Sequence, residues 1–333
     1  MTQKGAASIL PLTVSYAVLP EKGEDSFAIA SDQRGSLLCV ADGCGGLGSR
    51  RYSGQGEQTG AYLAARLVTA YVRDWASQRS ALPKTREEGQ AWLDALNAGL
   101  SALLSGFAAK NGLLEGGSRI VGSMQRALPS TLCAALTRPE PEGEKCCFLW
   151  AGDSRGYVLD ESGMHQYTKD DIRARLDPFD SLYLDAPLTR CLSADQPIRL
   201  HLRRAGLKNP SVLICATDGV YGCLPTPMEF EMLLLSTMEA AGDESAWQRK
   251  LEHAIRQLAT DDATLLCRPR GFEAYGDMKQ YFKPRLEALK AAYIHPVLRQ
   301  RQNREVARDC WSRYRPDYDR TEETPDVRDD WLL

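Results

Sequence analysis

The sequence predicts an α+β fold in which mostly antiparallel sheets carry helices on their outer surfaces. Many short apolar segments follow one another closely in the sequence, which is typical of antiparallel strands. A few longer segments place apolar residues at three- and four-residue spacing, which is typical of amphipathic helices. With 333 residues, 43% of them hydrophobic, the chain is long enough to bury a sizeable core in one large domain or two small ones.

The N-terminal part begins with three predicted strands, which we expect at residues 12–19, 26–30 and 36–41. Two helices follow, at 56–78 and 90–110. On both helices, aromatic and leucine side chains recur at helical spacing, so we predict that this stripe faces the core.

The middle of the chain returns to strands before two further helices. In order along the chain, we expect strands at 130–137, 145–151, 156–160, 198–203 and 211–217, helices at 226–240 and 243–258, and a last strand at 263–268. The region 170–189 contains Pro178 and Pro187 and matches no regular pattern.

The composition changes near residue 270. We therefore predict a main domain over residues 12–270 and a helical, charged C-terminal extension over residues 271–333. Within the extension, 277–300 is expected to be helical, and 301–333 is highly charged with scattered aromatic residues. We expect an appendage that packs on the domain, followed by a solvated tail. The alternative is a docking segment, because exposed aromatic side chains among charges suit protein recognition.

Acidic residues stand at the ends of four predicted strands. Two apolar runs close on Asp-Gly, and two strands are preceded by a pair of acidic residues: these are Asp42-Gly43, Asp218-Gly219, Glu24-Asp25 and Asp261-Asp262. Each Asp-Gly alone is common turn chemistry. Together they would form a cluster of carboxylates, which resist being ionised side by side unless cations neutralise them. Ligands that are all oxygen favour Mn²⁺ or Mg²⁺ over Zn²⁺.

Several other classes of protein are poorly matched. A net charge of -3 argues against broad nucleic-acid binding, and no apolar run approaches the ~20 residues of a membrane span. The ten cysteines contain no Cys-x-x-Cys and several lie in apolar strands, so we expect a reduced, cytoplasmic protein. The four histidines show no metal-ligand spacing, and the Walker phosphate loop is absent.

The ordered motifs resemble those of the metal-dependent protein phosphatases of the type 2C family. The resemblance runs from about Ser15 to about Arg268 and rests on Glu24-Asp25, Val40–Gly46, Leu149–Arg155, Thr168–Asp171, Thr189–Leu192, Leu213–Gly219 and Asp261–Thr264. The order of the whole set and the Gly-Asp-Ser-Arg motif are its specific features. It implies a two-sheet antiparallel β-sandwich with helices on both faces.

The resemblance also implies a set of ligands and a mechanism. Asp42 would bridge two Mn²⁺ or Mg²⁺ ions, with Asp218 and Asp261 completing one site and Asp25 and the Gly43 carbonyl completing the other. Glu24 is a further ligand or lies just behind the ligands, and Asp153 matches a position that can help to bind a third ion. A water held by two ions attacks phosphorus without a protein nucleophile, so catalysis would depend on Asp42 and Asp218.

The chain departs from the family pattern in places. Pro20 stands where the family usually has an arginine for substrate phosphate, and Lys22 is the candidate substitute, a point charge without bidentate geometry. Asp171 and Asp262 replace the usual histidine and asparagine.

Two main functions follow from these motifs and departures. One is a serine/threonine protein phosphatase in signalling, opposed by a kinase. The other is a catalytically weak regulator that binds phosphoproteins. A third is a regulator that acts mainly through the C-terminal extension.

Overall fold

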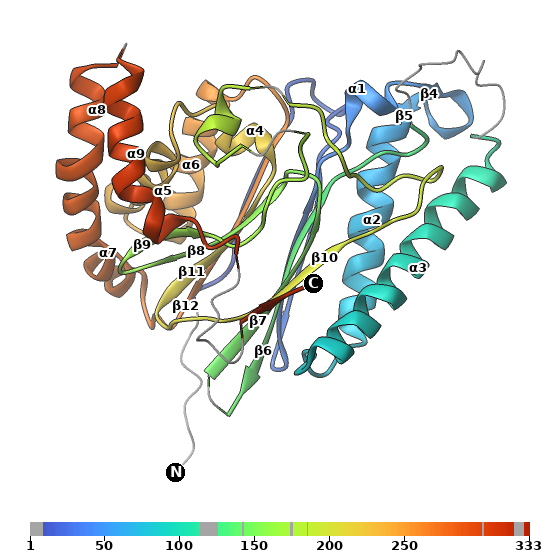
Figure 1. Cartoon of the computed structure of the whole chain (residues 1–333), viewed down its shortest axis with the longest axis horizontal. Coiled ribbons are helices and arrows are strands. Elements are labelled where there is room, and N and C mark those ends of the chain that lie inside the picture. Colours follow the sequence, from blue (N-terminus) through green and yellow to red (C-terminus); the bar gives the residue numbers. More distant parts are fainter. Residues whose placement is uncertain are drawn as a thin grey trace.

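The computed structural model describes residues 9–113, 126–141, 143–173, 176–184, 186–301, 303–322 and 330–333. Two antiparallel sheets pack face to face, and helices cover the outer face of each sheet (Figure 1). This α+β sandwich confirms the predicted fold class. None of the described helices has the length and apolar character needed to span a bilayer. The cytoplasmic location stays a prediction.

The first sheet has five strands, in the spatial order β1 (Leu12–Tyr16), β12 (Ala263–Arg270), β11 (Ser211–Ala216), β8 (Arg155–Asp160) and β9 (Gly163–Gln166). The second sheet has six, in the order β13 (Trp331–Leu332), β10 (His201–Gly206), β7 (Gly143–Ala151), β6 (Leu132–Glu140), β3 (Gly35–Ala41) and β2 (Ser26–Asp32). A separate two-stranded ribbon joins β4 (Arg51–Tyr52) and β5 (Gln58–Thr59).

Helices form the two outer layers. The second sheet is covered by α2 (Gly60–Ser77) and α3 (Arg86–Lys110) (Figure 1). The first sheet is covered by α5 (Pro227–Ala240), α6 (Glu244–Leu258), α7 (Tyr275–Leu289), α8 (His295–Arg299) and α9 (Arg304–Tyr318). A π-helix, Lys290–Ile294, connects α7 to α8. Two single-turn helices, α1 (Gly45–Gly48) and α4 (Asp218–Tyr221), lie at the same end of the sandwich (Figure 1).

Helices α2, α3, α5 and α6 begin where the sequence offers a side-chain cap. Thr59, Thr85 and Asp243 each accept a hydrogen bond from a backbone N–H in the first turn of the helix that follows. Thr226 does the same for α5, whose first residue is Pro227. The apolar spacing predicted helices at 56–78 and 90–110, and the caps at Thr59 and Thr85 place their starts at residues 60 and 86 instead.

Inner strands such as β3 and β11 are buried on both faces. In β3, Leu38 and Val40 point between the two sheets, whereas Leu37, Cys39 and Ala41 pack under α2 and α3. A strand covered on both sides carries apolar residues at every position, which is why residues 37–41 form a continuous apolar run.

The C-terminal region differs from the prediction. Residues 304–318 form α9, and Trp311, Tyr314 and Tyr318 are almost completely buried against the first sheet. The expected solvated tail is therefore wrong for residues 304–318, and the aromatic side chains there are not exposed as the alternative of a docking segment assumed. The aromatic residues stand three and four positions apart, which is the spacing of a buried helix face. Pro284 lies inside α7 without interrupting it.

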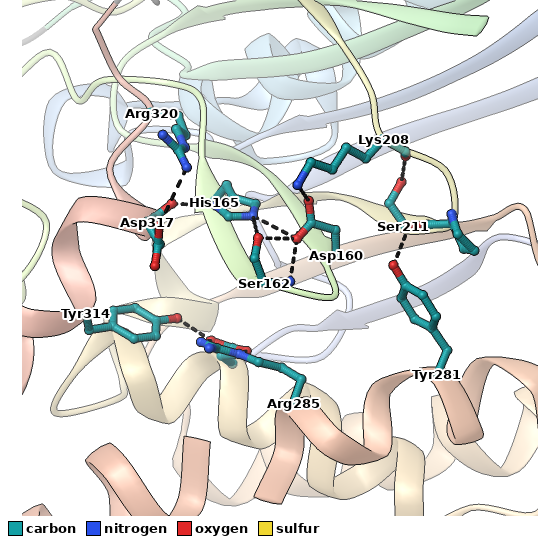
Figure 2. Close-up of polar contacts among 12 residues, drawn as sticks. Asp160, Ser162, His165, Lys208, Ser211, Tyr281, Arg285, Tyr314, Asp317 and Arg320 are labelled. Carbon is teal, nitrogen blue, oxygen red and sulfur yellow. Dashed lines mark hydrogen bonds and ion pairs between the residues drawn. The ribbon is translucent and has the colours of Figure 1, made fainter. Parts of the chain in front are cut away.

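The end of α9 is fastened to the hairpin formed by β8 and β9 (Figure 2). The ring of His165 on β9 donates from Nδ1 to the carbonyl oxygen of Asp317, 2.5 Å away, because a carbonyl can only accept. Its Nε2 lies 3.0 Å from Oδ1 of Asp160, which also accepts from Ser162 Oγ at 2.6 Å (Figure 2). The residues beyond 270 thus share a core with the first sheet, and the domain boundary stays a prediction.

Candidate active site

The second sheet brings two predicted carboxylates to one end of the sandwich. Asp25 immediately precedes β2, and Asp42 immediately follows β3. Ser26 pairs with Ala41 across these two strands, so the aspartates are neighbours at the strand ends.

The first sheet contributes three more carboxylates. Asp153 lies just before β8, Asp218 just after β11, and Asp261 just before β12. These three strands pair side by side, with Ala216 opposite Arg155, so their ends meet at one edge. Helix α1 follows Asp42, and helix α4 begins at Asp218. Both short helices lie at this end of the molecule (Figure 1).

Two glycines allow the acidic segments to approach each other closely. A Cβ on Gly43 would lie 2.5 Å from the carbonyl oxygen of Ala61 and 3.0 Å from that of Glu24. A Cβ on Gly219 would lie 2.0 Å from the carbonyl oxygen of Asp262. Both contacts are closer than any side chain tolerates, so glycine is required where the chain turns after Asp42 and Asp218.

Hydroxyl groups connect the acidic segments. Thr217 Oγ1 on the first sheet donates to Oδ2 of Asp25 on the second, at 2.8 Å. Thr131 Oγ1 accepts from the backbone N–H of Asp42 at 3.0 Å and lies 2.7 Å from Ser154 Oγ. The acidic residues from the two sheets are therefore joined at one site.

The two acidic residues that depart from the family pattern act as acceptors for loop backbone. Asp262 accepts from the N–H groups of Val18 and Glu24, at 2.8 and 2.6 Å. Asp171 accepts from the N–H of Gly152 at 3.1 Å. Both carboxylates hold loops that carry candidate ligands.

The carboxyl groups at this site are hard to ionise. Burial raises the pKa of Asp25 to about 7, despite its hydrogen bonds and with the charge of Asp218 adding to the rise. Burial, followed by the charge of Asp261, raises the pKa of Asp218 to about 6. The pKa values of Asp42 and Asp153 are raised well above the usual range, first by burial and then by the charge of Asp218. Burial is thus the main reason why these groups resist ionisation, and the charges of neighbouring carboxylates add to it.

The donor set suits a hard cation. Oδ1 of Asp25 is buried and has no hydrogen-bond partner among the described residues, whereas Asp42 remains partly exposed. Asp153 and Asp218 line a cavity of about 210 Å³ beside Arg155. In the described part of the chain, no three His, Cys, Asp or Glu side chains are already gathered as a metal site. The donors at this site are carboxylate oxygens, at least one of them without a described partner, and such a set fits hard divalent ions such as Mn²⁺ or Mg²⁺.

Glu24 and Asp261 complete the predicted ligand set at the edge of the site. Glu24 accepts a hydrogen bond from Thr59, the cap of α2, and its carboxylate packs against Gly45. Burial raises the pKa of Glu24, partly offset by Thr59, and the charge of Asp261 adds to the rise. Asp261 is exposed, and its Oδ1 accepts from the N–H of Asp262 at 2.8 Å.

Lys22 and Arg66 are cations close to Glu24 and Asp25, and the charge of Arg51 also acts on Glu24. Lys22 is exposed, and its side chain has no described contact with the carboxylates. Arg66 on α2 was missed from the sequence: its guanidinium donates to the carbonyl of Gly23 at 3.0 Å. Burial lowers the pKa of Arg66, and the charges of Asp25 and other neighbours oppose this. No motif could have revealed it, because only the docking of α2 brings Arg66 to the site.

Arg155 of the Gly-Asp-Ser-Arg motif is buried beside the cavity. It makes two hydrogen bonds to Asp170, of 2.9 and 2.6 Å, and lies 3.9 Å from the ring centre of Tyr221. The Tyr221 hydroxyl donates to the carbonyl of Asp153 at 2.6 Å. The motif therefore has a structural role, and it also places Asp153 at the cavity.

A family model described as Protein phosphatase 2C matches residues 21–258. The chain belongs to the protein phosphatase 2C family. The resemblance and the enzyme class predicted from the sequence are thereby confirmed: this is a serine/threonine protein phosphatase. The match ends before Asp261 and before helices α7 to α9.

Solved structures of bacterial phosphatases have a similar fold. The serine/threonine phosphatase Stp1 from Staphylococcus aureus is 18% identical with a TM-score of 0.58, over 78% of this chain and 94% of that one. PstP/Ppp from Mycobacterium tuberculosis is 19% identical with a TM-score of 0.57, over 80% and 100%. A structure of the catalytic domain of PstP with two manganese ions is 20% identical with a TM-score of 0.53, over 79% and 98%. No curated protein sequence matches the chain.

Proposed function

We propose that this phosphatase hydrolyses phosphoserine and phosphothreonine esters in proteins with two Mn²⁺ or Mg²⁺ ions. The main support is the position of the carboxylates, which stand at strand ends of both sheets and are linked by the hydrogen bond from Thr217 to Asp25. Burial and neighbouring charges also raise the pKa of Asp25 to about 7 and that of Asp218 to about 6. Because ionised carboxylates are costly there, bound divalent ions would stabilise them. The catalytic domain of PstP, which is similar in fold, holds two manganese ions, and this supports the same number here.

The proposed ligands come from strand ends and the turns beyond them: Asp25, Asp42, the Gly43 carbonyl, Asp218 and Asp261. Asp42 would be shared between the two ions. Glu24 would be a ligand or would hold the ligands through hydrogen bonds, and Asp153 would serve a third ion.

When bound, such ions supply positive charge to a phosphate group and make water acidic enough to act as a nucleophile near neutral pH. Residues of the chain hold the ligands in place, because Thr217 bonds the Asp25 carboxylate and Thr131 bonds the Asp42 backbone. Lys22 and Arg66 are the cations proposed to bind the phosphate oxygens beside Asp25. Lys22 is exposed and free to reorient, whereas Arg66 is held by Gly23.

The test uses the full chain with a phosphothreonine peptide and with p-nitrophenyl phosphate, in Mn²⁺, Mg²⁺ or chelator. We expect turnover with either metal and none with chelator. Asp218→Asn should lower kcat by roughly 100-fold or more, because it removes a charged ligand. The control is Asp74→Asn, an exposed aspartate on α2 that should leave kcat unchanged.

A second function predicts a different result. Pro20 and the exposed Lys22 favour a regulator that binds phosphoproteins without efficient hydrolysis. Calorimetry with the same phosphothreonine peptide would then show tight, metal-dependent binding while the turnover assay stays negative. If the metal-loaded chain neither binds nor hydrolyses the peptide, both functions are wrong. An opposing kinase stays a prediction.

A further inference from the structure

Residues 176–184 form a short segment that lies against α9. Phe179 is completely buried, and its ring stacks on Trp311 of α9 with centroids 6.1 Å apart and planes at 18°. The indole Nε1 of Trp311 donates to Oδ2 of Asp177 at 3.1 Å. Oδ1 of Asp177 accepts from the N–H groups of Phe179 and Asp180, which fixes the turn of the segment. An aromatic contact and a network of hydrogen bonds thus attach this segment to α9.

Charged side chains add to this attachment. Arg304 and Arg308, one turn apart on α9, both bond the carboxylate of Asp180, with the Arg304 contact at 3.3 Å. Arg315, further along the helix, lies 3.4 Å from Asp177. The arginines are about half exposed, so each pair alone is weak, but several pairs along one helix act on the same short segment.

The other side of the segment faces the candidate active site. Ser181 Oγ accepts from the buried guanidinium of Arg155 at 2.7 Å. Ser181 and Leu184 line the cavity of about 210 Å³ that also contains Asp153 and Asp218. The segment is therefore a wall between α9 and the carboxylates.

The rim of this wall carries exposed apolar side chains. Tyr183 and Leu184 are 42% and 54% exposed, although both are large and hydrophobic. The guanidinium of Arg304 lies 4.2 Å from the ring centre of Tyr183, and the Tyr183 hydroxyl donates to the carbonyl of Pro225 at 2.8 Å. Tyr183 is next to Leu184, which lines the cavity, and an ordered, exposed aromatic side chain beside the cavity suits contact with a polypeptide rather than with a small phosphate ester.

We propose that α9 positions segment 176–184 as the wall that contacts the polypeptide around a phosphorylated residue. Helix α9 thereby sets the affinity for protein substrates and takes no part in hydrolysis itself. The proposal rests on the function proposed above, and it assigns a role to a helix outside the matched residues 21–258.

The test reverses the charges that hold the segment. The double variant Arg304→Glu, Arg308→Glu makes α9 repel Asp180, and adding Asp180→Lys restores attraction with the signs exchanged. The charge-matched control is Arg299→Glu, Arg313→Glu: Arg299 is exposed on α8, and Arg313 pairs with Asp309 on α9. Each full-length protein is assayed in Mn²⁺ with a phosphothreonine peptide and with p-nitrophenyl phosphate. Hydrogen exchange of the amides in 176–184 is measured in parallel.

We expect faster exchange in segment 176–184 for the double variant than for the wild type and the control. KM for the phosphothreonine peptide should rise roughly threefold to tenfold, the size expected when two partly exposed ion pairs are lost. The values of kcat for both substrates and of KM for p-nitrophenyl phosphate should stay within the range of the control. The triple variant with Asp180→Lys should recover both the exchange rate and the peptide KM.

Unchanged exchange in the double variant would show that α9 does not hold the segment, and would overturn the proposal. Faster exchange with an unchanged peptide KM would also overturn it. So would an equal loss of kcat/KM for the peptide and for p-nitrophenyl phosphate. If the wild type hydrolyses neither substrate, the proposed phosphatase function is wrong, and so is the role in substrate affinity that rests on it. Exchange still reports separately whether α9 orders the segment.

Discussion

Gly43 shows how one absent side chain shapes the candidate site. The turn after Asp42 passes so close to α2 that a Cβ at position 43 would lie 2.5 Å from the carbonyl oxygen of Ala61. The same close approach brings the turn after Asp42 next to Glu24, whose carbonyl oxygen would lie 3.0 Å from that Cβ. Gly46, three residues later, has no atom within 4 Å of the place where a Cβ would be.

Gly43→Ala should therefore lower the free energy of unfolding by about 1–3 kcal/mol, because the added methyl group must displace backbone. The matched variant Gly46→Ala should change it by no more than about 0.5 kcal/mol. Urea denaturation of both proteins measures the difference. Equal stabilities would contradict the close approach at Gly43.

At the scale of helices, a buried carboxylate joins three elements of the outer layer. Glu231 on α5 is fully buried and forms two hydrogen bonds with Arg285 on α7, of 2.6 and 2.8 Å. It also accepts from the Tyr314 hydroxyl on α9 at 2.5 Å; Arg285 and Tyr314 are labelled in Figure 2. A carboxylate this deep is stable only while its partners remain.

Arg285→Met should cost about 3–5 kcal/mol of stability, because it leaves the Glu231 charge buried without its cation. Glu231→Leu combined with Arg285→Met should cost less than the single variant, since no unpaired charge remains. Arg256→Met removes an exposed ion pair with Glu252 and should cost no more than about 1 kcal/mol. Thermal and urea unfolding would contradict this account if the double variant were the least stable.

For the whole molecule, stability and metal binding are linked through the carboxylates at the end of the sandwich. The pKa of Asp25 is raised from 3.8 to about 7 and that of Asp218 from 3.8 to about 6. Between pH 3.8 and the raised pKa of each group, the folded chain binds more protons than the unfolded chain. The contribution of these two groups to the free energy of unfolding therefore falls as pH rises through this range. This stabilising contribution is fully present below about pH 4 and is lost as pH rises through about 6 to 7.

The metal-free protein should therefore lose thermal stability between about pH 5 and pH 8, and Asp25→Asn should reduce that loss. Saturating Mn²⁺ should raise the melting temperature more at about pH 8 than at about pH 5, because ligands must be deprotonated to bind. Scanning calorimetry with metal and with chelator measures both effects. A metal-induced shift that is larger at the lower pH would contradict the proposed ligands.

Much of the fold could be predicted because its signals are local. The strands near 26–30, 36–41 and 211–217 are apolar runs that end at glycine or acidic residues, and the structure places strands there. Helix α9 was missed, because its many charges concealed the spacing of Trp311 and Tyr314. Strand β13 is only two residues long and depends on pairing with β10, which no local pattern reveals.

The residues at the strand ends could be predicted without the structure, because a run of apolar residues and the turn that follows it depend on neighbours along the chain. The sequence pattern placed Asp42 and Asp218 after buried strands and Asp25 and Asp261 before them. Only tertiary packing brings these ends to the same end of the sandwich, places Arg66 beside them and sets α9 against segment 176–184. Those contacts join residues far apart in the chain, and only the packing of two sheets and their helices brings such residues together.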